Sequence, residues 1–273
     1  MLNVDEVKKA AQNMRIDIIK AISAAGSGHP GGSLSATDIL ATLYFYKMNV
    51  NPADPKMDNR DKFVLSKGHA APALYAALGE KGYFDVEEMY SLRKIGSVFQ
   101  GHPDMKKVPG VEMSTGSLGQ GFSTAVGMAI AGKLDSKKSK VYVLLGDGEI
   151  QEGIVWEAAM SAAHYKLDNL VAILDNNGLQ IDGRNDDVMQ VEPIYEKFES
   201  FGWEVMEADG HDIEELAEKL DEADDVTGKP VMIIARTVKG KGVSFMEDEA
   251  GWHGKAPGAD DTAQALTELG GEQ

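Results

Sequence analysis

Two short polar segments each follow an apolar run of strand length in the middle of the chain. Gly146-Asp147-Gly148 follows residues 141–145, and Asp175-Asn176-Asn177-Gly178 follows residues 170–174. Parallel sheets bind ligands beyond the carboxyl ends of their strands, so both segments are expected to point oxygen ligands at one place. Carboxylate, amide and carbonyl oxygens suit a hard cation such as Mg²⁺, which keeps phosphate oxygens in its shell. Each segment alone is typical of a turn, but the pair predicts a site for a metal-bound diphosphate.

Histidines offer a second kind of chemistry. Four of the six lie beside Gly or Pro in separate, loop-like segments: His29, His69, His102 and His253. An imidazole can donate to a sugar hydroxyl or carbonyl and move protons near neutral pH. A single such histidine is more often structural than catalytic, whereas four around a proposed metal site indicate catalysis. The remaining two, His164 and His211, are assigned structural roles.

The segment TVKGKGVSF carries two lysines, Lys239 and Lys241, in a glycine-rich stretch. Their ammonium groups could attract the phosphate of a substrate. A solvated glycine-rich loop explains the same residues equally well, so the sequence leaves both interpretations open.

Hydrophobic periodicity predicts the helices that position these segments. Apolar residues recur at three- and four-residue intervals over residues 4–22, and Gly26 and Gly28 end that helix. The helix beginning near Gln151 could offer its N-terminus to an anion. Residues 95–116, rich in Gly and Pro, are expected to form a long, functional loop. Further helices are predicted over residues 35–48, 85–92, 151–165, 193–201, 212–223 and 259–269.

Short apolar runs between these helices predict strands at residues 141–145, 170–174, 203–207 and 231–235. Such an alternation is typical of parallel strands covered on both faces. No repeat, low-complexity tract or linker divides the chain. We therefore expect an α/β fold with a mostly parallel central sheet and helices on both faces. It forms one domain over residues 1–273, whose C-terminal segment 236–273 carries a WHGKAP loop.

Composition excludes several classes of protein. The chain has 27 Lys and Arg against 44 Asp and Glu, a net charge of −17, which argues against nucleic-acid partners and anionic membranes. The absence of cysteine excludes disulfides, thiol nucleophiles and Cys-ligated metals. No apolar run approaches the ~20 residues that span a bilayer, and no secretory signal pattern is present. A cytoplasmic protein is expected.

At this point the sequence resembles a known family. GDG followed about thirty residues later by NN is the thiamine diphosphate signature, and its surroundings, GDGEIQEGIVWEAAMSAAHYKLDNLVAILDNNGLQIDG, resemble transketolase in particular. Further segments agree, in order, over nearly the whole chain: SGHPGG at 27–32, NRDKFVLSKGHAAPALYAAL at 59–78, GHPD at 101–104, TGSLGQGFSTAVGMA at 115–129 and WHGKAP at 252–257.

The resemblance implies the thiamine diphosphate-binding fold and a Mg²⁺ ion, for which Ca²⁺ or Mn²⁺ can substitute. The implied metal ligands are the side chains of Asp147 and Asn177 and the backbone carbonyl of Leu179. Gly148 is expected against the diphosphate, and Ser117 stands where the family usually has Pro, which changes the stiffness of that loop. The apolar slot around the rings of the cofactor is implied to contain Gly116, Leu118 and Ile181. The full set of implied cofactor-binding residues is His69, Gly116, Leu118, Gly146, Asp147, Gly148, Glu149, Asn177, Ile181 and His253.

The same resemblance implies the catalytic residues. His69 and His253 are expected on the diphosphate side. His29 and His102 are expected at the hydroxyls of the donor ketose. The implied catalytic set is completed by two glutamates, which in transketolases join two active sites across a dimer interface: Glu152 and Glu157.

The implied reaction transfers a two-carbon ketol unit from a ketose phosphate to an aldose phosphate. Thiamine diphosphate carries the chemistry, while the protein binds, orients and relays protons. Complete transketolases are much longer, and this chain corresponds to their diphosphate-binding part. The pyrimidine-binding domain and the activating glutamate are therefore expected on a second polypeptide, the C-terminal subunit of a split transketolase with an α₂β₂ assembly.

Other functions compete with this interpretation. 1-Deoxyxylulose-5-phosphate synthase and the α subunit of a 2-oxo acid dehydrogenase share the cofactor, but TGSLGQG and GHPD favour transketolase. A non-catalytic cofactor-binding subunit would keep Asp147 and Asn177 and need none of the four histidines. A simple Mg-nucleotide binder is disfavoured because no GxxxxGK[ST] loop is present.

Overall fold

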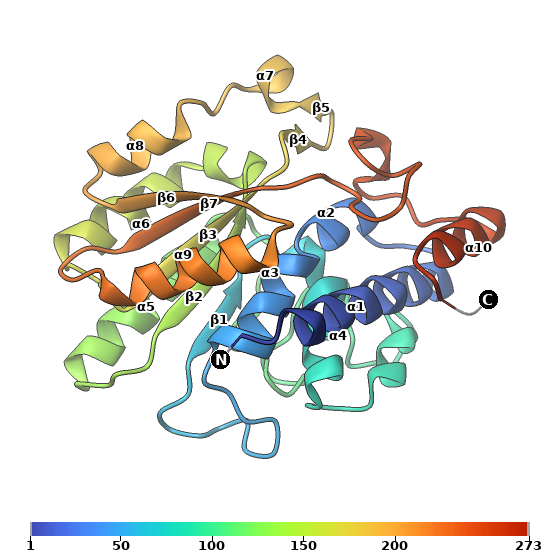
Figure 1. Ribbon diagram of the computed structural model, residues 1–273, viewed down its shortest axis with the longest axis horizontal. Coiled ribbons are helices and arrows are strands. Elements are labelled where there is room, and N and C mark those ends of the chain that lie inside the picture. Colours follow the sequence, from blue (N-terminus) through green and yellow to red (C-terminus); the bar gives the residue numbers. More distant parts are fainter. Residues whose placement is uncertain (1, 272–273) are drawn as a thin grey trace.

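Five strands form the central sheet of the computed structural model, which describes residues 2–271 (Figure 1). Their order across the sheet is β1-β2-β3-β7-β6, and every neighbouring pair is parallel. The strands are β1 Lys62–Leu65, β2 Val141–Gly146, β3 Leu170–Asn176, β6 Glu204–Asp209 and β7 Val231–Arg236. A small antiparallel hairpin pairs β4 Leu179–Gln180 with β5 Gly183–Arg184. The predicted α/β class is confirmed; the ends of the predicted domain, residues 1 and 272–273, lie outside the described residues.

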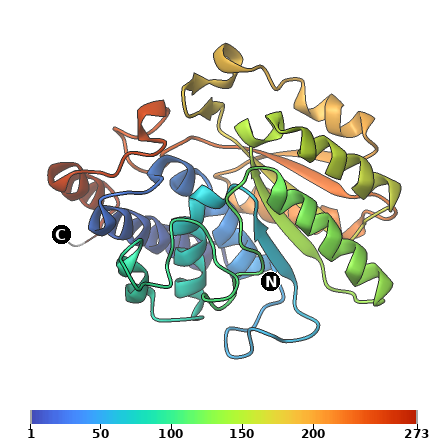
Figure 2. The same ribbon diagram turned by 180° about the vertical axis from the view of Figure 1, so that it is seen from behind.

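Each face of the sheet carries its own hydrophobic core, because successive side chains of a strand point to opposite faces. In β3, Val171 and Ile173 belong to one core, and Ala172 and Leu174 belong to the other. The first core is covered by α1 Val4–Ala25, α3 Thr37–Thr42, α4 Ala71–Lys81 and α9 Ile213–Asp225, which lie in front in Figure 1. The second is covered by α5 Gln120–Leu134, α6 Gly153–His164 and α8 Ile194–Ser200, seen in front of the sheet in Figure 2.

Several helix ends follow the local signals that predicted them. α1 ends at Gly26, whose φ of 62° is the left-handed conformation that glycine adopts without strain. α9 begins after Asp212, whose side chain accepts from the N–H of Glu214 at 2.9 Å. α10 Ala259–Glu268 is held on α1, where the Thr262 hydroxyl donates to Ser23 Oγ at 2.8 Å. Among the helices in residues 2–271, none has the length and apolar character needed to cross a bilayer.

The helix predicted over residues 35–48 differs from the structure. Helical backbone begins earlier, at α2 Pro30–Ser35, and continues through α3 into a π-helical turn, η1 Leu43–Lys47. Proline suits the first helical position because its φ is fixed and its missing N–H is not needed there. Gly31 and Gly32 hid this start, because glycine is a poor helix former. The element predicted over residues 85–92 is a 3₁₀ helix, η3 Val86–Ser91, capped by Asp85.

Besides several short elements, the sequence prediction missed β1, α4 and α5. β1 has only four residues, and residues 71–79 of α4 are buried on all sides, so neither produces an amphipathic pattern. The long loop expected over residues 95–116 contains no helix or strand. Short elements complete the described chain: η2 Gly68–Ala70, η4 Gly148–Gln151, α7 Asn185–Val188 and η5 Ala250–Trp252.

Candidate functional site

The carboxyl ends of β2 and β3 meet at Asp147. The two strands are neighbours in the sheet, with Gly146 paired to Asp175. Asp147 Oδ1 accepts the N–H of Gly148 at 2.8 Å, and its Oδ2 accepts the N–H of Gly178 at 2.5 Å. One carboxylate therefore joins the two polar segments that follow these strands.

A cavity of about 230 Å³ opens at this edge of the sheet. Besides His29 and Leu179, it is lined by all of the residues predicted to bind the cofactor: His69, Gly116, Leu118, Gly146, Asp147, Gly148, Glu149, Asn177, Ile181 and His253. These residues come from five segments between residues 69 and 253, and the parallel topology brings them to one place. Ile181 lines this cavity and is 68% exposed, so its apolar side chain can contact a bound group.

Three of the four predicted histidines form a triangle in this cavity. The ring centroids lie 5.2 Å apart for His29 and His69, 5.4 Å for His29 and His253, and 5.2 Å for His69 and His253. Burial and nearby positive charge lower the pKa of His29 to about 4 and that of His253 to about 3, and they hold the pKa of His69 well below its usual value. All three imidazoles are therefore neutral at pH 7.

The fourth histidine, His102, does not line the cavity itself but lies behind Gly116, which does. A Cβ atom added to Gly116 would meet His102 Cδ2 at 3.1 Å, so the glycine lets the imidazole approach the cavity. Burial lowers the pKa of His102 as well. By contrast, Glu152 and Glu157 are exposed, at the start and along the outer face of α6, and do not line the cavity. Their role across a dimer interface stays a prediction.

The two histidines assigned structural roles lie outside the cavity. His211 Nδ1 is 2.7 Å from Asp38 Oδ2, and its Nε2 accepts the N–H of Val238 at 2.8 Å. Both nitrogens of His211 therefore have partners, one in α3 and one in the loop after β7. His164 ends α6 and contacts the ring of Tyr165.

Glu149 lines the cavity, but its carboxylate is bound by the protein. It accepts the N–H groups of Gly119 at 2.7 Å and Gly146 at 3.0 Å, and the hydroxyl of Ser66. Burial raises the pKa of this carboxyl. The side chain therefore supports the TGSLGQG loop and the end of β2. Its contact with the cofactor stays a prediction.

Two buried lysines lie at this cavity. The sequence prediction missed Lys67 and left the role of Lys239 open. Lys239 is only 2% exposed, so the solvated-loop interpretation is wrong for it; its Nζ donates to the Leu179 carbonyl at 3.2 Å and lies 2.9 Å from His253 Nδ1. Lys67, which lies in the quoted segment SKGHAAP, lines the same cavity and pairs with Asp175. Burial and the Lys67 charge lower the pKa of Lys239 to about 8. Lys241 is partly exposed, 3.6 Å from Glu247.

These groups fit a divalent cation and an anion. Burial and the charge of Asp175 raise the pKa of Asp147 to about 6, and no ion pair in residues 2–271 involves Asp147. A bound cation would stabilise its charged form. Among the described residues, no group of three or more acidic or histidine side chains is arranged to hold a metal ion by itself, so a cation here needs further oxygens from the backbone, a ligand or water. Mg²⁺ is bound in this way beside phosphates.

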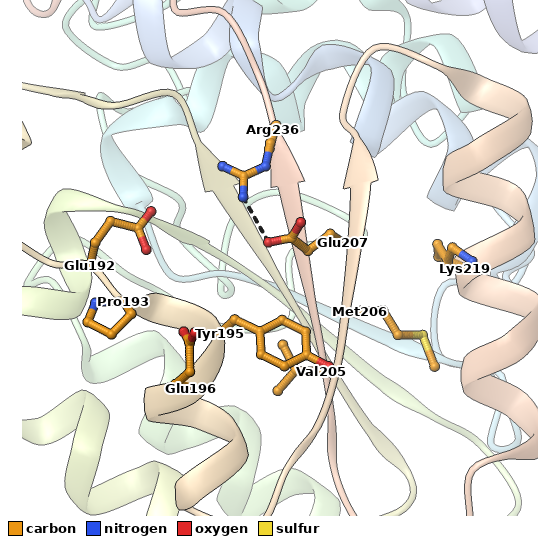
Figure 3. Close-up of a pocket in the computed structure, with 9 residues that line it drawn as sticks. All are labelled: Glu192, Pro193, Tyr195, Glu196, Val205, Met206, Glu207, Lys219 and Arg236. Carbon is orange, nitrogen blue, oxygen red and sulfur yellow. Dashed lines mark hydrogen bonds and ion pairs between the residues drawn. The ribbon is translucent and has the colours of Figure 1, made fainter.

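A wider hollow of about 690 Å³ lies elsewhere, over the edge strand β6 (Figure 3). Two of its exposed polar side chains, Arg236 and Glu207, point toward each other, with Arg236 Nη2 2.8 Å from Glu207 Oε1. Among the described residues that line it, none carries a buried charge. The predicted site residues all lie outside this hollow.

Comparison with known proteins identifies the family and the fold. Residues 6–273 match the model of the transketolase thiamine diphosphate-binding domain. The chain belongs to the transketolase family. It is 45% identical over 248 residues to the 6-deoxy-6-sulfo-D-fructose transketolase subunit of a Clostridium species, covering 91% of this chain and 90% of that protein. It is 43% identical over 268 residues to one of the named subunits of the apulose-4-phosphate transketolase of Phocaeicola vulgatus, covering 98% and 95%.

The transketolase fold is also found in complete enzymes. The crystal structure of a Pichia stipitis transketolase in complex with sedoheptulose-7-phosphate matches with a TM-score of 0.92 and 38% identity. The match covers 97% of this chain and 41% of that one. The chain is thus a transketolase-type thiamine diphosphate-binding protein.

Proposed function

We propose that this chain is the cofactor-binding subunit of a two-chain transketolase. The complex transfers a two-carbon ketol unit from a ketose phosphate to an aldose phosphate, with thiamine diphosphate and Mg²⁺. The observation that carries the proposal is the cavity in which Asp147 joins two strand ends beside three neutral histidines and two buried lysines. Family membership supports the cofactor, and the neutral histidines support sugar chemistry.

The chain's own residues would hold the cofactor through its diphosphate. Asp147, Asn177 and the Leu179 carbonyl would ligate Mg²⁺, while Lys67 and Lys239 would neutralise the phosphate oxygens. Bound thiamine diphosphate supplies a carbon nucleophile and a sink for the electron pair released when a carbon–carbon bond breaks. Gly116, Leu118 and Ile181 line the side of the cavity that suits its apolar rings.

Neutral imidazoles suit the substrate side of this site. Since the pKa of His29 is about 4, the ring stays uncharged at pH 7 and can donate a hydrogen bond from one nitrogen while accepting at the other. We assign His29 and His102 to the hydroxyls of the ketose, where they orient the sugar and move protons. His69 and His253 lie nearer the lysines and are assigned to the diphosphate side.

The proposed partner is a C-terminal subunit that carries the pyrimidine-binding domain and the activating glutamate. Two relatives named as subunits match this chain over 90% and 95% of their own length, whereas it spans only 41% of the Pichia enzyme. Ile181, which lines the cavity, and Met189, which follows α7, are exposed apolar side chains that a partner would cover. An α₂β₂ assembly, with Glu152 and Glu157 facing a second copy of this chain, completes the proposal.

Co-expression with the product of the neighbouring reading frame tests the proposal. The purified chain alone is expected to show no ketol transfer, and the co-purified complex should transfer the unit from a ketose phosphate. Turnover by this chain without any second polypeptide would overturn the two-chain proposal. A complex that consumes pyruvate but no ketose phosphate would instead be a different thiamine diphosphate enzyme.

A further inference from the structure

A carboxylate with no exposed surface lies directly behind the cavity. Asp175 is 0% exposed and is not among the residues that line the cavity. Its oxygens accept from Ser35 Oγ at 2.6 Å, from Asn177 Nδ2 at 3.3 Å, and from Lys67 Nζ and Thr237 Oγ1. A buried carboxylate is stable only when its charge and its lone pairs are matched in this way.

The four donors come from four separate parts of the chain. Ser35 ends α2, Lys67 follows β1, Asn177 follows β3, and Thr237 follows β7. Asp175 therefore fixes the carboxyl ends of three strands and one helix around a single point.

A second buried carboxylate, Glu149, extends this network. Ser66, the residue before Lys67, donates to Glu149, and its Oγ also accepts the N–H of Phe122 at 2.9 Å. Glu149 in turn accepts the N–H groups of Gly119 and Gly146. The Ser66-Lys67 dipeptide thus bridges two buried carboxylates, Glu149 and Asp175.

Asp175 decides which way the Asn177 amide points. An ionised carboxylate can only accept hydrogen bonds, so the NH₂ group of Asn177 must face it. The amide oxygen is then turned to the other side, where it accepts the N–H of Leu179 at 3.1 Å. Asn177 lines the cavity together with Asp147 and Leu179, the other two predicted metal ligands.

Asp175 also places a positive charge at the cavity. Lys67 is 2% exposed, and its only carboxylate partner within residues 2–271 is Asp175. The pair holds the Lys67 ammonium in the wall of the cavity, where an anionic ligand can meet it. Without Asp175, the two buried lysines would face one another with no buried carboxylate paired to either.

We propose that Asp175 is a positioning residue for the metal and diphosphate site, acting through Asn177 and Lys67 without touching either ligand. The inference rests on the proposed function, since it concerns the same cavity. It predicts that the charge of Asp175 controls cofactor affinity in advance of any chemistry. Groups that orient metal ligands in this way typically change affinity by about 10- to 100-fold when they are removed.

Calorimetry on the co-purified complex tests it, with Mg²⁺ and thiamine diphosphate as the probes. Asp175→Asn keeps the shape of the side chain, removes its charge and is expected to weaken cofactor binding about 10- to 100-fold. The matched control is Asp61→Asn: Asp61 accepts the N–H groups of Asn49 at 2.9 Å and Lys140 at 2.8 Å, away from the cavity. The control should bind the cofactor within about twofold of the parent.

If the Asp175→Asn variant does not fold, Thr237→Val provides a second test of the same proposal. It removes one hydrogen bond to Asp175 at nearly constant volume and should weaken cofactor binding several-fold. A parent complex that fails to bind the cofactor would overturn the proposed function itself. A parent that binds it, with either variant at parental affinity, would overturn only the role of Asp175.

Discussion

The cavity at the ends of β2 and β3 and the hollow over β6 differ in a way that volume does not predict. The hollow is about three times larger, 690 Å³ against 230 Å³. Its charges are solvated: the side chains of Arg236 and Glu207 are 59% and 45% exposed. In the cavity, the side chains of Lys67 and Asp175 are 3% and 0% exposed.

The difference teaches that buried charge, rather than size, marks this site. Ion pairs exposed to water form and break at little cost in free energy. The charges in the hollow are therefore stable without a bound ligand. Keeping several ionisable groups buried at one sheet edge costs free energy, and the walls must compensate with precise hydrogen bonds. Perturbed groups clustered in this way are typical of functional sites.

The largest expected effect tests the cavity side of the comparison. Asp147→Ala removes the carboxylate that joins both strand ends, and it should lower Mg-dependent affinity for thiamine diphosphate by more than ~100-fold, beyond what outer-shell groups control. Calorimetry of the complex measures this. Unchanged affinity would contradict the site assignment, and Glu207→Ala in the hollow is the matched control.

The next effect concerns catalysis without binding. His102→Ala in the assembled enzyme should slow ketol transfer by ~100-fold, the lower range for a group that moves protons. Cofactor affinity should stay within about twofold, because His102 does not line the cavity and is assigned to the ketose hydroxyls rather than to the diphosphate. Steady-state rates on a ketose phosphate provide the measurement. Full activity in this variant would favour a non-catalytic cofactor-binding subunit.

A buried carboxylate far from the cavity sharpens the comparison. Burial raises the pKa of Asp17 to about 6, partly offset by the hydrogen bond from Tyr90 and by Lys20 and reinforced by Glu80. The folded protein then binds this proton more tightly than the unfolded chain does. Protonated Asp17 therefore contributes to the free energy of unfolding below about pH 4, and this stabilisation is lost as pH rises through about 6.

Asp17→Asn should therefore stabilise the protein at pH 7.5 by on the order of 1 kcal/mol, with little gain near pH 4. The Tyr90 hydroxyl can still donate to the amide oxygen. Urea unfolding at the two pH values measures the difference. Cofactor affinity should not change, which separates Asp17 from Asp147, whose pKa is also about 6. A variant less stable at pH 7.5 would refute the assignment.

The smallest effect is expected in the hollow. Glu207→Gln breaks the ion pair with Arg236, and because both side chains are exposed it should change the free energy of unfolding by less than ~1 kcal/mol. Activity and cofactor affinity should equal those of the parent. A tenfold loss of either would show that the hollow has a function after all.

The sequence predicted the parts of the site that depend on local spacing. Apolar runs of strand length marked β2 and β3, and the turns GDG and NNG marked where they end. Because consecutive parallel strands are often neighbours, Asp147 and Asn177 could be placed together without coordinates. The alternation of helices and strands was enough for the fold class.

Other features were invisible to local patterns. α4 and α5 carry no amphipathic stripe, and the start of α2 is masked by glycines. The sequence left Lys239 open between a phosphate-attracting group and a solvated glycine-rich loop, because lysine is seldom fully buried. Its burial follows from the packing of the loop after β7 against Leu179 and His253.

The residue types and their order along the chain determined which chemistry is available: oxygen ligands at two strand ends, imidazoles in loops and a family-wide pattern around them. Tertiary structure alone decided which of these groups are charged, which are neutral and in which direction each one points. Asp175 meets Ser35 across 140 positions of sequence and Lys67 across 108. The free energy of a buried charge depends on such distant partners, and no periodicity within a strand or helix records them.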